Sequence, residues 1–521
     1  MLWSGWGDPA KAAELPAPVR RLLGEALGVR EPAVPAATFG EVRLNASTLP
    51  PGVLTLLAAV VGADHVRSDD DARIRHTRGK STPDLLLMRA GDGSDAPDAV
   101  VLPGSHQQVV EVLGVCAAHR VAVVPFGGGT SVVGGLVASR RGFAGVVALD
   151  LARLNRLVSA DPVSMIAEME PGLRAPQAEQ LLAGHGLTLG HFPQSYEYAT
   201  LGGFAAARSS GQASAGYGRF DDMVAGMTVA TPRGTLDLGR APRSAAGPDL
   251  RQVILGSEGA FGVITSLRLR VHRAPSLRVY EGWRFGGFAA GTAAMRRLAQ
   301  EEAGPTVLRL SDETETMIGL AKPAELGASS ESGCLMVAGY EGEPGDVAYR
   351  RERAAKALAE AGGVCLGPEP GEAWARGRYS APYLRDSLLA AGATVETLET
   401  ACFWSGLPRL YDAVRLALTG SLGSPLVMCH VSHVYATGAS LYFTVVTAQA
   451  PDPLGQWAAA KRAASEAILR AGGTISHHHG VGRDHREAYA VEIGDLGGEI
   501  LRGIKERLDP EGILNPGVLI P

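Results

Sequence analysis

Apolar and polar positions follow their most regular pattern from Asp98 onward. The runs DAVVLP, VAVVPF and GVVALDL read as strands. Between the first two strands, Ser105 precedes HQQVVEVLGVCAAHR, in which apolar residues recur at helical spacing behind a capping serine. A glycine turn then leads into the strand that ends ILGSEGAFGVITSLRLRVH. This alternation predicts an α+β or α/β unit and argues against a repeat array.

The pattern changes after about Ala274. Strand-like SLRVYEGWRF, SGCLMVAGYEG and SLYFTVV are separated by long helices rich in Ala, Leu, Glu and Arg, which predicts a second α+β domain. Further on, WAAAKRAASEAILRAGG predicts a helix that ends at Gly472 and Gly473, and Asp-Pro stops the last helix. We therefore predict four parts with these bounds: 1–95, mainly helical; 96–275; 276–455; and 456–521.

Composition narrows the class of protein. The 521 residues are 46% hydrophobic and 20% charged, which is ordinary for a soluble protein of roughly two to four domains. A net charge of −5 disfavours a nucleic-acid partner. The five cysteines are scattered without a C-x-x-C pair, so we expect a reducing compartment and neither a disulfide framework nor a cysteine zinc site.

The sequence also bears on the location of the protein. No apolar run reaches the ~18 residues that a membrane span needs. The start, MLWSGWGDPAKAAELP, lacks the basic and apolar regions of a secretory signal, and the final LIP is not a peroxisomal tripeptide. We expect a cytoplasmic protein.

A glycine loop, PFGGGTSVVGG, follows a buried strand at residues 125–135. Glycines let backbone N–H groups approach an anion, and Thr130 and Ser131 add hydroxyl donors, so the loop suits a diphosphate. It is neither a Walker A loop nor the G-x-G-x-x-G dinucleotide fingerprint. Taken alone, the loop leaves a plain glycine-rich turn open as an alternative.

Two further loops of the same kind follow. PQSYEYATLGGFAAARSSG spans residues 193–211 and GSEGAFGVIT spans residues 256–265. Three such loops within ~140 residues can surround one long dinucleotide. In this order they resemble the FAD domain of the vanillyl-alcohol oxidase superfamily, the PCMH type. The resemblance implies an α+β fold: a two-part FAD-binding domain at 96–275, an α+β cap over the flavin at 276–455, and C-terminal helices and a tail at 456–521 that return to the FAD domain.

The same resemblance assigns cofactor contacts. The first loop would hold the FAD diphosphate, the second would line the flavin, and the third would contact the adenine half or the isoalloxazine edge. We expect non-covalent FAD, because the first loop has neither the His nor the Cys that tethers flavin in some relatives. The predicted cofactor-binding residues are Pro125, Phe126, Gly127, Gly128, Gly129, Thr130, Ser131, His191, Gln194, Ser195, Tyr196, Glu197, Tyr198, Ala199, Thr200, Ala207, Arg208, Ser209, Ser210, Glu258, Gly259, Ala260, Phe261, Gly262, Val263 and Ile264.

Other segments narrow the resemblance to the alkyldihydroxyacetonephosphate (alkylglycerone-phosphate) synthases, from residue 2 to the end. They are LWSGWGDP, RLSD, PYLRD, CHVSHVYATGASLYF, SHHHGVGR and LDPEGILNPG. The sequence departs from that family at three positions. His430 stands in place of an arginine, His433 in place of a glutamine, and Arg483 in place of a lysine.

The resemblance implies a reaction without net redox change. Acyl-dihydroxyacetone phosphate exchanges its acyl group for a fatty alcohol through an adduct at flavin N5, giving an ether lipid precursor. Tyr442 is the candidate acid/base. Since a phenol titrates near ~10, it needs cationic or hydrogen-bonding neighbours. Arg309 would support catalysis, and Arg385, His430 and His433 would bind substrate. Spacing alone would favour a cross-strand aromatic pair for Tyr442 and surface ion pairs for the arginines.

Three consecutive histidines, His477, His478 and His479, stand in ISHHHGVGR. Neighbours on an extended segment point to opposite sides, so at most His477 and His479 could face one ion, and we expect no metal. A catalytic loop over the flavin is favoured, with His477 and His479 pointing inward as a pair, or His478 alone.

Two other functions stay open at this point. A flavin dehydrogenase or oxidase would transfer a hydride from a 2-hydroxy acid or alcohol to flavin N5. A non-catalytic flavin-binding protein would catalyse neither this transfer nor the acyl–alkyl exchange. For the enzyme we expect a small-molecule or lipid substrate, a homodimer, and peripheral contact with a membrane as the source of lipid.

Overall fold

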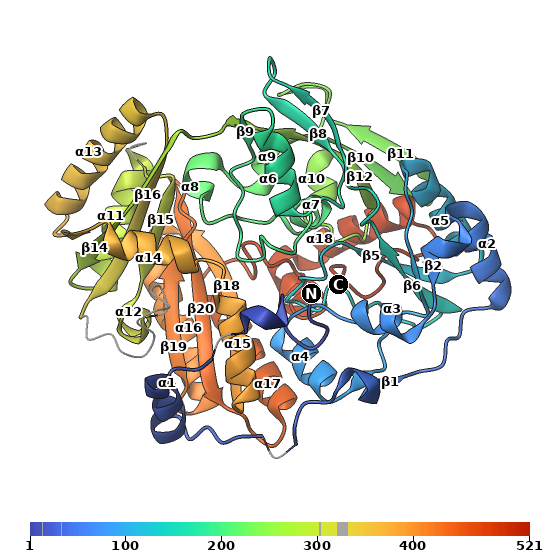
Figure 1. Cartoon of the computed structure of the whole chain (residues 1–521), viewed down its shortest axis with the longest axis horizontal. Helices are drawn as coiled ribbons and strands as arrows, with labels where there is room; N and C mark the ends of the chain where they lie inside the picture. The colour runs from blue at the N-terminus through green and yellow to red at the C-terminus, as the bar shows by residue number, and fades with distance from the viewer. Residues whose placement is uncertain (13, 33, 302–303, 320–331) are drawn as a thin grey trace.

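The computed structural model describes residues 1–12, 14–32, 34–301, 304–319 and 332–521. Three main sheets form its frame (Figure 1). The smallest has the order β2-β4-β6-β5, with β4, β6 and β5 parallel and β2 antiparallel. Helices α2 and α5 pack against it and share its core. The bounds are β2 Val66–Arg67, β4 Ala99–Val101, β5 Val121–Phe126, β6 Gly145–Asp150, α2 Pro51–Val61 and α5 His106–Ala118.

A second, antiparallel sheet has the order β11-β10-β12-β8-β7. Short helices around it carry apolar side chains into a shared core. The strands are β7 Leu157–Asp161, β8 Ile166–Met169, β10 Val224–Thr231, β11 Gly234–Leu238 and β12 Val263–Arg270, and the helices are α6 Ala175–Ala183, α7 Leu201–Ala207, α8 Ser214–Tyr217, α9 Phe220–Met223 and α10 Arg251–Ile254. A small pair, β9 Leu187–Thr188 and β13 His272–Arg273, leads to the third sheet.

The third sheet is antiparallel with the order β17-β14-β16-β15-β19-β20-β18. Helices α11, α13, α16 and α17 bury one face, while α14 and α15 lie on the other. The strands are β14 Leu277–Phe285, β15 Val307–Ser311, β16 Cys334–Gly342, β17 Val364–Gly367, β18 Ala393–Phe403, β19 Leu426–Val431 and β20 Gly438–Ala448. The helices are α11 Phe288–Gln300, α12 Glu313–Ile318, α13 Pro344–Glu360, α14 Glu369–Gly377, α15 Ala381–Ala390, α16 Leu407–Leu422 and α17 Pro453–Arg470.

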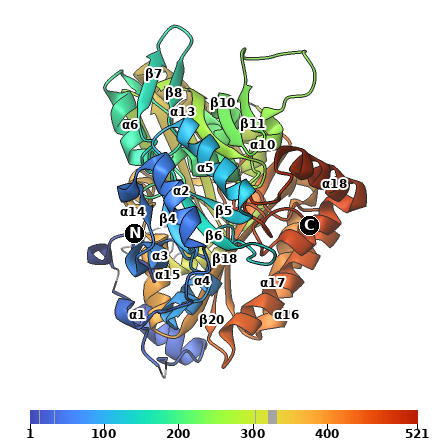
Figure 2. The same ribbon diagram turned by 90° about the vertical axis from the view of Figure 1, so that its right-hand side faces the viewer.

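The two ends of the chain join these parts. Residues 1–95 are spread over the molecule: β2 pairs with β4, while α1 (Ala17–Arg21) packs on β18, β19 and β20. The remaining elements there are β1 Arg43–Leu44, α3 Asp70–Arg75, α4 Thr82–Arg89 and β3 Asp92–Gly93. α18 (Arg486–Leu508) is kinked at Gly494, and Leu514 beyond it forms a parallel bridge with Val123 of β5 (Figure 2).

The predicted start of helix α5 and the predicted end of helix α17 agree with the structure. Ser105 caps α5 by accepting a hydrogen bond from the Gln108 backbone N–H at 3.2 Å. α17 ends at Arg470, and Gly472 beyond it adopts a φ of 77°. The α+β class is confirmed. Among the described residues, no helix is both long and apolar enough to cross a membrane.

Candidate active site

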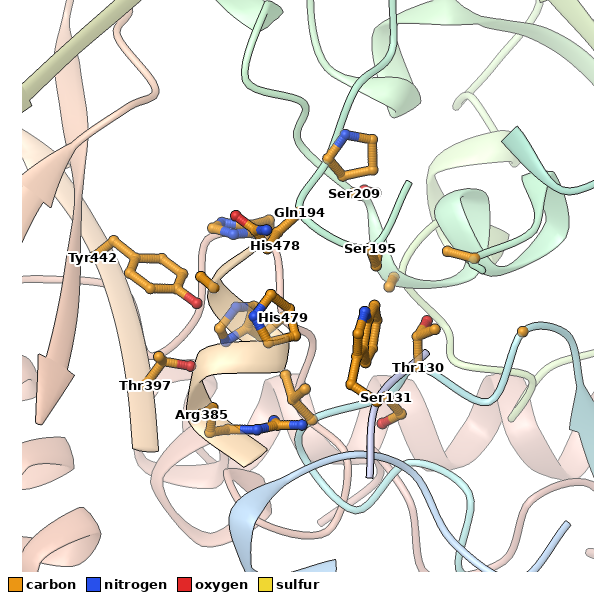
Figure 3. Close-up of a pocket in the computed structure, with 18 of the residues that line it drawn as sticks. Thr130, Ser131, Gln194, Ser195, Ser209, Arg385, Thr397, Tyr442, His478 and His479 are labelled. Atoms are coloured by element: carbon orange, nitrogen blue, oxygen red, sulfur yellow. The ribbon is translucent and has the colours of Figure 1, made fainter. Parts of the chain in front are cut away.

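A cavity of about 510 Å³ lies between the glycine loops and the face of the seven-stranded sheet that carries α14 and α15. Figure 3 shows Tyr442 on one side, Thr130 and Ser131 on the opposite side, and His478 and His479 between them. Segments far apart in the chain thus meet around a single space.

The first glycine loop forms a cradle of backbone donors. In the described chain, the N–H groups of residues 127–132 donate to no protein atom, although the loop lines the cavity. A Cβ on Gly128 would stand 2.0 Å from the carbonyl oxygen of Tyr198, so only glycine allows the first two loops to touch. Free, converging N–H groups are what a diphosphate requires. The residues present therefore fit FAD.

The second and third loops contribute only part of their predicted contacts. Those that line the cavity are Gln194, Ser195, Ala199, Thr200, Ala207, Ser209, Ser210, Glu258, Gly259, Gly262, Val263 and Ile264, together with Pro125 to Ser131 of the first loop. Those that do not are His191, Tyr196, Glu197, Tyr198, Arg208, Ala260 and Phe261.

The residues outside the cavity have other partners. Arg208 pairs with Asp221 at 3.1 Å, and Glu197 pairs with Lys11 at 2.5 Å. Buried His191 lies behind the loop, with its Nε2 3.1 Å from Ser209 Oγ, so it can reach the cavity only through that hydroxyl. The remaining residues pack against the N-terminal segment, α14–α15 or the core: Tyr196, Tyr198, Ala260 and Phe261.

Tyr442 projects from β20 onto the cavity face of the sheet. Its ring stacks on His430 at 4.8 Å and lies 5.5 Å from His479. Burial raises the pKa of the Tyr442 phenol to about 12, only partly offset by the Thr397 hydroxyl. The phenol is therefore protonated at neutral pH. It can donate a proton directly, and it can accept one only after a bound ligand or cofactor has lowered its pKa.

The histidine loop wraps around a buried carboxylate, Glu399 of β18. The backbone N–H groups of His477, His478 and His479 donate to it at 2.7, 3.1 and 2.9 Å, and the Ser476 hydroxyl donates at 2.7 Å. Burial by itself would raise the pKa of Glu399, but the imidazoles and the Ser476 hydroxyl hold it well below its ordinary value. The carboxylate is thus ionised and sets the shape of the loop.

Two more glutamates, exposed Glu492 and partly buried Glu258, bind the same loop. Glu492 of α18 accepts from the Ile475 N–H at 2.7 Å. Glu258, from the third glycine loop, accepts from the N–H groups of Val481 and Gly482 at 2.9–3.1 Å. Since Glu258 also lines the cavity, it links the predicted flavin site directly to the histidines.

The alternation predicted for the three histidines is wrong. His478 and His479 both line the cavity, whereas His477 faces away and its Nε2 lies 2.6 Å from Tyr435 Oη. The alternation rule applies to extended backbone, but this segment turns so that three successive N–H groups point at Glu399.

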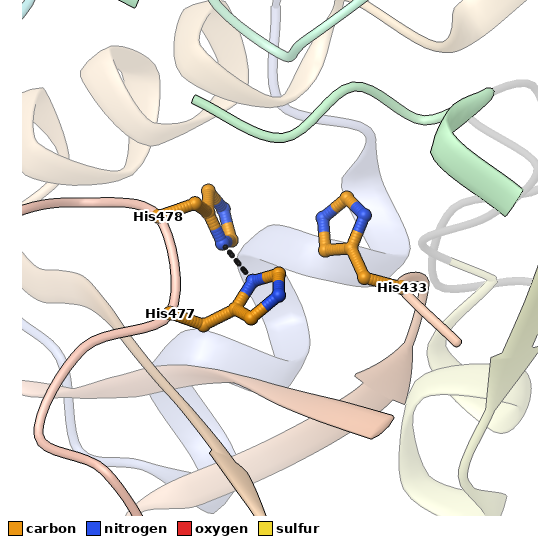
Figure 4. A group of neighbouring side chains, drawn as sticks. All are labelled: His433, His477 and His478. Carbon is orange, nitrogen blue, oxygen red and sulfur yellow. Dashed lines mark hydrogen bonds between the residues drawn. The ribbon is translucent and has the colours of Figure 1, made fainter. Parts of the chain in front are cut away.

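The loop also brings His477 and His478 close to His433. One nitrogen from each of these residues lies within 4.8 Å of the others, and Figure 4 shows the His477–His478 hydrogen bond. Adjacent histidines therefore can converge, contrary to the sequence argument. Each ring already has a protein partner: His433 Nδ1 lies 3.0 and 2.9 Å from the Ser210 and Ser214 hydroxyls. The absence of a metal stays a prediction.

Burial determines the charge of these imidazoles. It lowers the pKa of His477 and His478 to about 4 and that of His479 to about 3, although Glu399 acts in the opposite direction. The pKa of His433 is also well below its ordinary value because of burial. At neutral pH the histidines act as neutral hydrogen-bonding groups and not as cations.

Arg309 of β15 enters the cavity already paired. Its guanidinium donates to Glu315 at 2.6 Å and lies 3.0 Å from His430 Nδ1, which is itself 3.2 Å from Glu315. Glu315 is fully buried. The carboxylate therefore balances the arginine charge, and His430 completes the cluster.

Arg385 of α15 also reaches the cavity. Its Nη1 donates a hydrogen bond to the Lys80 carbonyl oxygen at 2.6 Å, and its Nη2 lies 3.5 Å from Asp386 Oδ1. Lys80 in turn donates through Nζ to the carbonyls of Leu2 and Trp3 at 2.8 Å. Arg385 thus ties the start of the chain to the cavity wall.

The cavity has an apolar branch that the sequence did not reveal. It is lined by these side chains from the N-terminal segment, α15 and the sheet: Val19, Leu22, Leu23, Leu27, Ile318, Leu384, Leu388, Val395, Leu426, Met428 and Val446. Glu315, Glu399 and Arg378 are further residues that sequence reasoning missed. A signal for Glu399 was present, because ATVETLETACF places two acidic residues in an otherwise strand-like run.

Comparison with known proteins gives consistent matches. Residues 97–238 match the family described as "FAD binding domain", and residues 274–519 match "FAD linked oxidases, C-terminal domain". An alkyldihydroxyacetonephosphate synthase from Dictyostelium discoideum is 34% identical over 515 residues, covering 94% of this chain and 84% of that protein. One from Trypanosoma brucei brucei is 33% identical over 568 residues, covering 100% and 92%. A solved alkyldihydroxyacetonephosphate synthase structure has a TM-score of 0.82 and 30% identity, covering 99% of this chain and 98% of that one. FAD as cofactor and the PCMH-type fold are confirmed.

Proposed function

Because this chain belongs to the alkyldihydroxyacetonephosphate synthase family of FAD-dependent enzymes, we propose that it performs the exchange for which those relatives are named. The acyl group of an acyl-dihydroxyacetone phosphate is replaced by a fatty alcohol. One C–O bond to the acyl carboxylate breaks, one C–O bond to the alcohol oxygen forms, and the alcohol loses a proton. Electrons balance without an external oxidant or reductant.

One observation carries this proposal: the residues of the FAD cradle, Tyr442 and a group of apolar side chains all line one cavity. A lipid with a polar head and a long chain requires such a shape, since burying each CH₂ contributes about 0.8 kcal/mol. Bound FAD supplies an electrophilic ring against which the reacting carbon is held.

Tyr442 is the group that moves the proton. It faces the cradle across the cavity, and His478 and His479 lie beside it as neutral hydrogen-bonding partners. In the resting site its pKa is about 12 because of burial, so loading of FAD and substrate must lower that pKa before the phenol can accept a proton. Arg309 and Arg385 supply guanidinium N–H groups at the wall, each with a carboxylate beside it.

The cofactor is held without a covalent bond in this proposal. No cysteine of the described residues lines the cavity, and the first loop contains no histidine. Acid precipitation should release all flavin into the supernatant, and yellow colour retained in the pellet would contradict this.

The decisive test uses palmitoyl-dihydroxyacetone phosphate and labelled hexadecanol with the FAD-loaded protein. We expect labelled alkyl product and an unbleached flavin spectrum. Anaerobic bleaching by D-lactate or another 2-hydroxy acid, without ether formation, would favour the dehydrogenase alternative instead.

Three expectations about the setting belong to the same proposal. A reducing, cytoplasmic location is supported by the five cysteines, none of which is paired. A homodimer is supported by exposed Val491, Leu496 and Ile500 on α18, which light scattering can test. Peripheral membrane contact follows from the proposed lipid substrate, and vesicle flotation tests it.

A further inference from the structure

Arg378, at the end of α14, lines the same cavity and has no assigned role. Its guanidinium carbon lies over three aromatic rings, 4.8 Å from Trp374, 5.4 Å from Phe192 and 5.5 Å from Tyr379. Its Nε donates to Gln212 Oε1 at 2.6 Å. Rings and amide together hold the planar guanidinium in one orientation, which pre-organises it for a ligand.

Two donors at this place lack an acceptor. Within the described chain, the nitrogen atoms Nη2 of Arg378 and Nε2 of Gln194 are buried and make no hydrogen bond. Gln194 also lines the cavity, and Gln212 is bonded to both residues. A buried donor without a partner is destabilising, and more so when it is charged, so these two donors indicate a ligand that accepts hydrogen bonds.

Arg378 differs from the other cavity arginines in its charge balance. Arg309 is paired with buried Glu315, and Arg385 has Asp386 at 3.5 Å. Among the described residues, Arg378 has no carboxylate within 4.0 Å, so its positive charge is available to an anion.

We propose that Arg378 and Gln194 bind the phosphate group of the substrate. This inference rests on the proposed function and deepens it, because it assigns the phosphate to a wall of the cavity that family resemblance does not mark. A guanidinium presents two parallel N–H donors that match two phosphate oxygens. His430, which stands where the family has an arginine, is already engaged with Arg309 and Glu315.

The geometry also suits the reaction. Gln194 and Ser195 follow one another in the second glycine loop, and both line the cavity together with His478 (Figure 3). A phosphate held there anchors the substrate between the FAD-binding part and the cap, because Arg378 and Gln194 belong to different parts. The alkyl chain is then free to extend along the apolar branch.

The test separates the two substrates of the FAD-loaded enzyme. Arg378→Gln and, independently, Gln194→Leu should raise the KM for palmitoyl-dihydroxyacetone phosphate about 10- to 100-fold, since each removes hydrogen bonds to a charged group. The KM for hexadecanol should stay within about twofold in both variants, and the flavin absorbance should stay within about twofold in the Arg378 variant. The control, Arg376→Gln, alters an exposed arginine of the same helix that pairs with Glu372 and should match the wild type.

An equal rise in both KM values, or no rise in either, would overturn the assignment. A separate measurement covers the case in which no ether product forms. Calorimetry with inorganic phosphate on the FAD-loaded protein should show binding to the wild type and at least tenfold weaker binding to both variants, about 1.4 kcal/mol. Absent binding, or equal binding in all proteins, rejects the phosphate site independently of the proposed reaction.

Discussion

The two walls of the cavity are built on different principles. The FAD-binding wall presents backbone: free N–H groups of residues 127–132 and glycines where side chains would collide. The cap wall presents side chains from separate strands and helices, such as Arg309 of β15 against Glu315 of α12. Backbone N–H donors do not titrate. The charge and orientation of the side chains on the cap wall depend instead on their protonation and on partners that are distant in the sequence. The first wall is suited to holding a cofactor and the second to handling protons and anions.

Gly128→Ala should have the largest effect, because it breaks the backbone wall alone. The new Cβ would stand 2.0 Å from the Tyr198 carbonyl oxygen, so the first two loops must separate and the diphosphate cradle is lost. We expect less than about a tenth of the wild-type flavin content and of the activity, as for the loss of several charged hydrogen bonds. The ratio of flavin to protein absorbance measures the flavin content.

Gly114→Ala is the matched control, since a Cβ there meets nothing within 4 Å. Equal flavin contents in both variants would show that the cradle does not hold the cofactor.

Tyr442→Phe should affect only the side-chain wall. Loss of the acid/base group lowers kcat by about a hundredfold to ten-thousandfold, while flavin content stays at the wild-type level. Tyr349→Phe, at a largely exposed tyrosine, serves as control. Full ether-forming activity in the Tyr442 variant would remove the phenol from the mechanism.

Glu399→Gln tests the contact on which the histidine loop depends. An amide offers one acceptor oxygen to four donors, and its NH₂ group opposes the rest, so the loop should lose its shape. We expect a fall in kcat of about 10- to 100-fold, as for a lost charged hydrogen bond, with FAD retained. Steady-state kinetics measure this change. The control is Glu466→Gln, which alters a glutamate of an exposed ion pair with Arg470 on α17. Unchanged kcat would mean that the loop holds its position without the carboxylate.

The smallest effect concerns pH. Burial lowers the pKa of His477 to about 4, below the ~6.5 of an unfolded chain, so between these values the unfolded state binds the extra proton. Stability is therefore complete above pH ~6.5 and falls on acidification, by about 1.4 kcal/mol per pH unit for this group.

His477→Gln should reduce the slope of unfolding free energy against pH by that amount between pH 6 and 5, measured by urea titration. Exposed His185→Gln should leave the slope unchanged. If the two variants have the same slope, the imidazole of His477 is not held neutral by burial.

Most elements near the glycine loops could be predicted because their signals are local. The cap of α5, the buried strand β5 and the loop after it depend on neighbours within a few residues. The histidine loop could not be predicted in the same way. Its turn is set by Glu399, 78 residues before His477, and no local pattern encodes that contact.

The roles of individual side chains also differ in how far the local sequence predicts them. Tyr442, the candidate acid/base implied by the family resemblance, lines the cavity. Arg208 and Glu197 looked like cofactor contacts because they stand in the right loops, yet both have salt-bridge partners outside the cavity. Position in a motif places the backbone, but the direction of a long side chain depends on which opposite charge lies within reach.

The sequence by itself determined the glycine loops and the strand that carries Tyr442, because spacing, glycine content and turn residues act over short distances. The α+β class and the binding of FAD to those loops followed from the resemblance to a known family. The tertiary structure alone decided which histidines face the cavity, which arginines are neutralised and where an apolar branch opens. Those features arise from contacts between residues hundreds of positions apart, and their energies depend on burial, which only the folded chain defines.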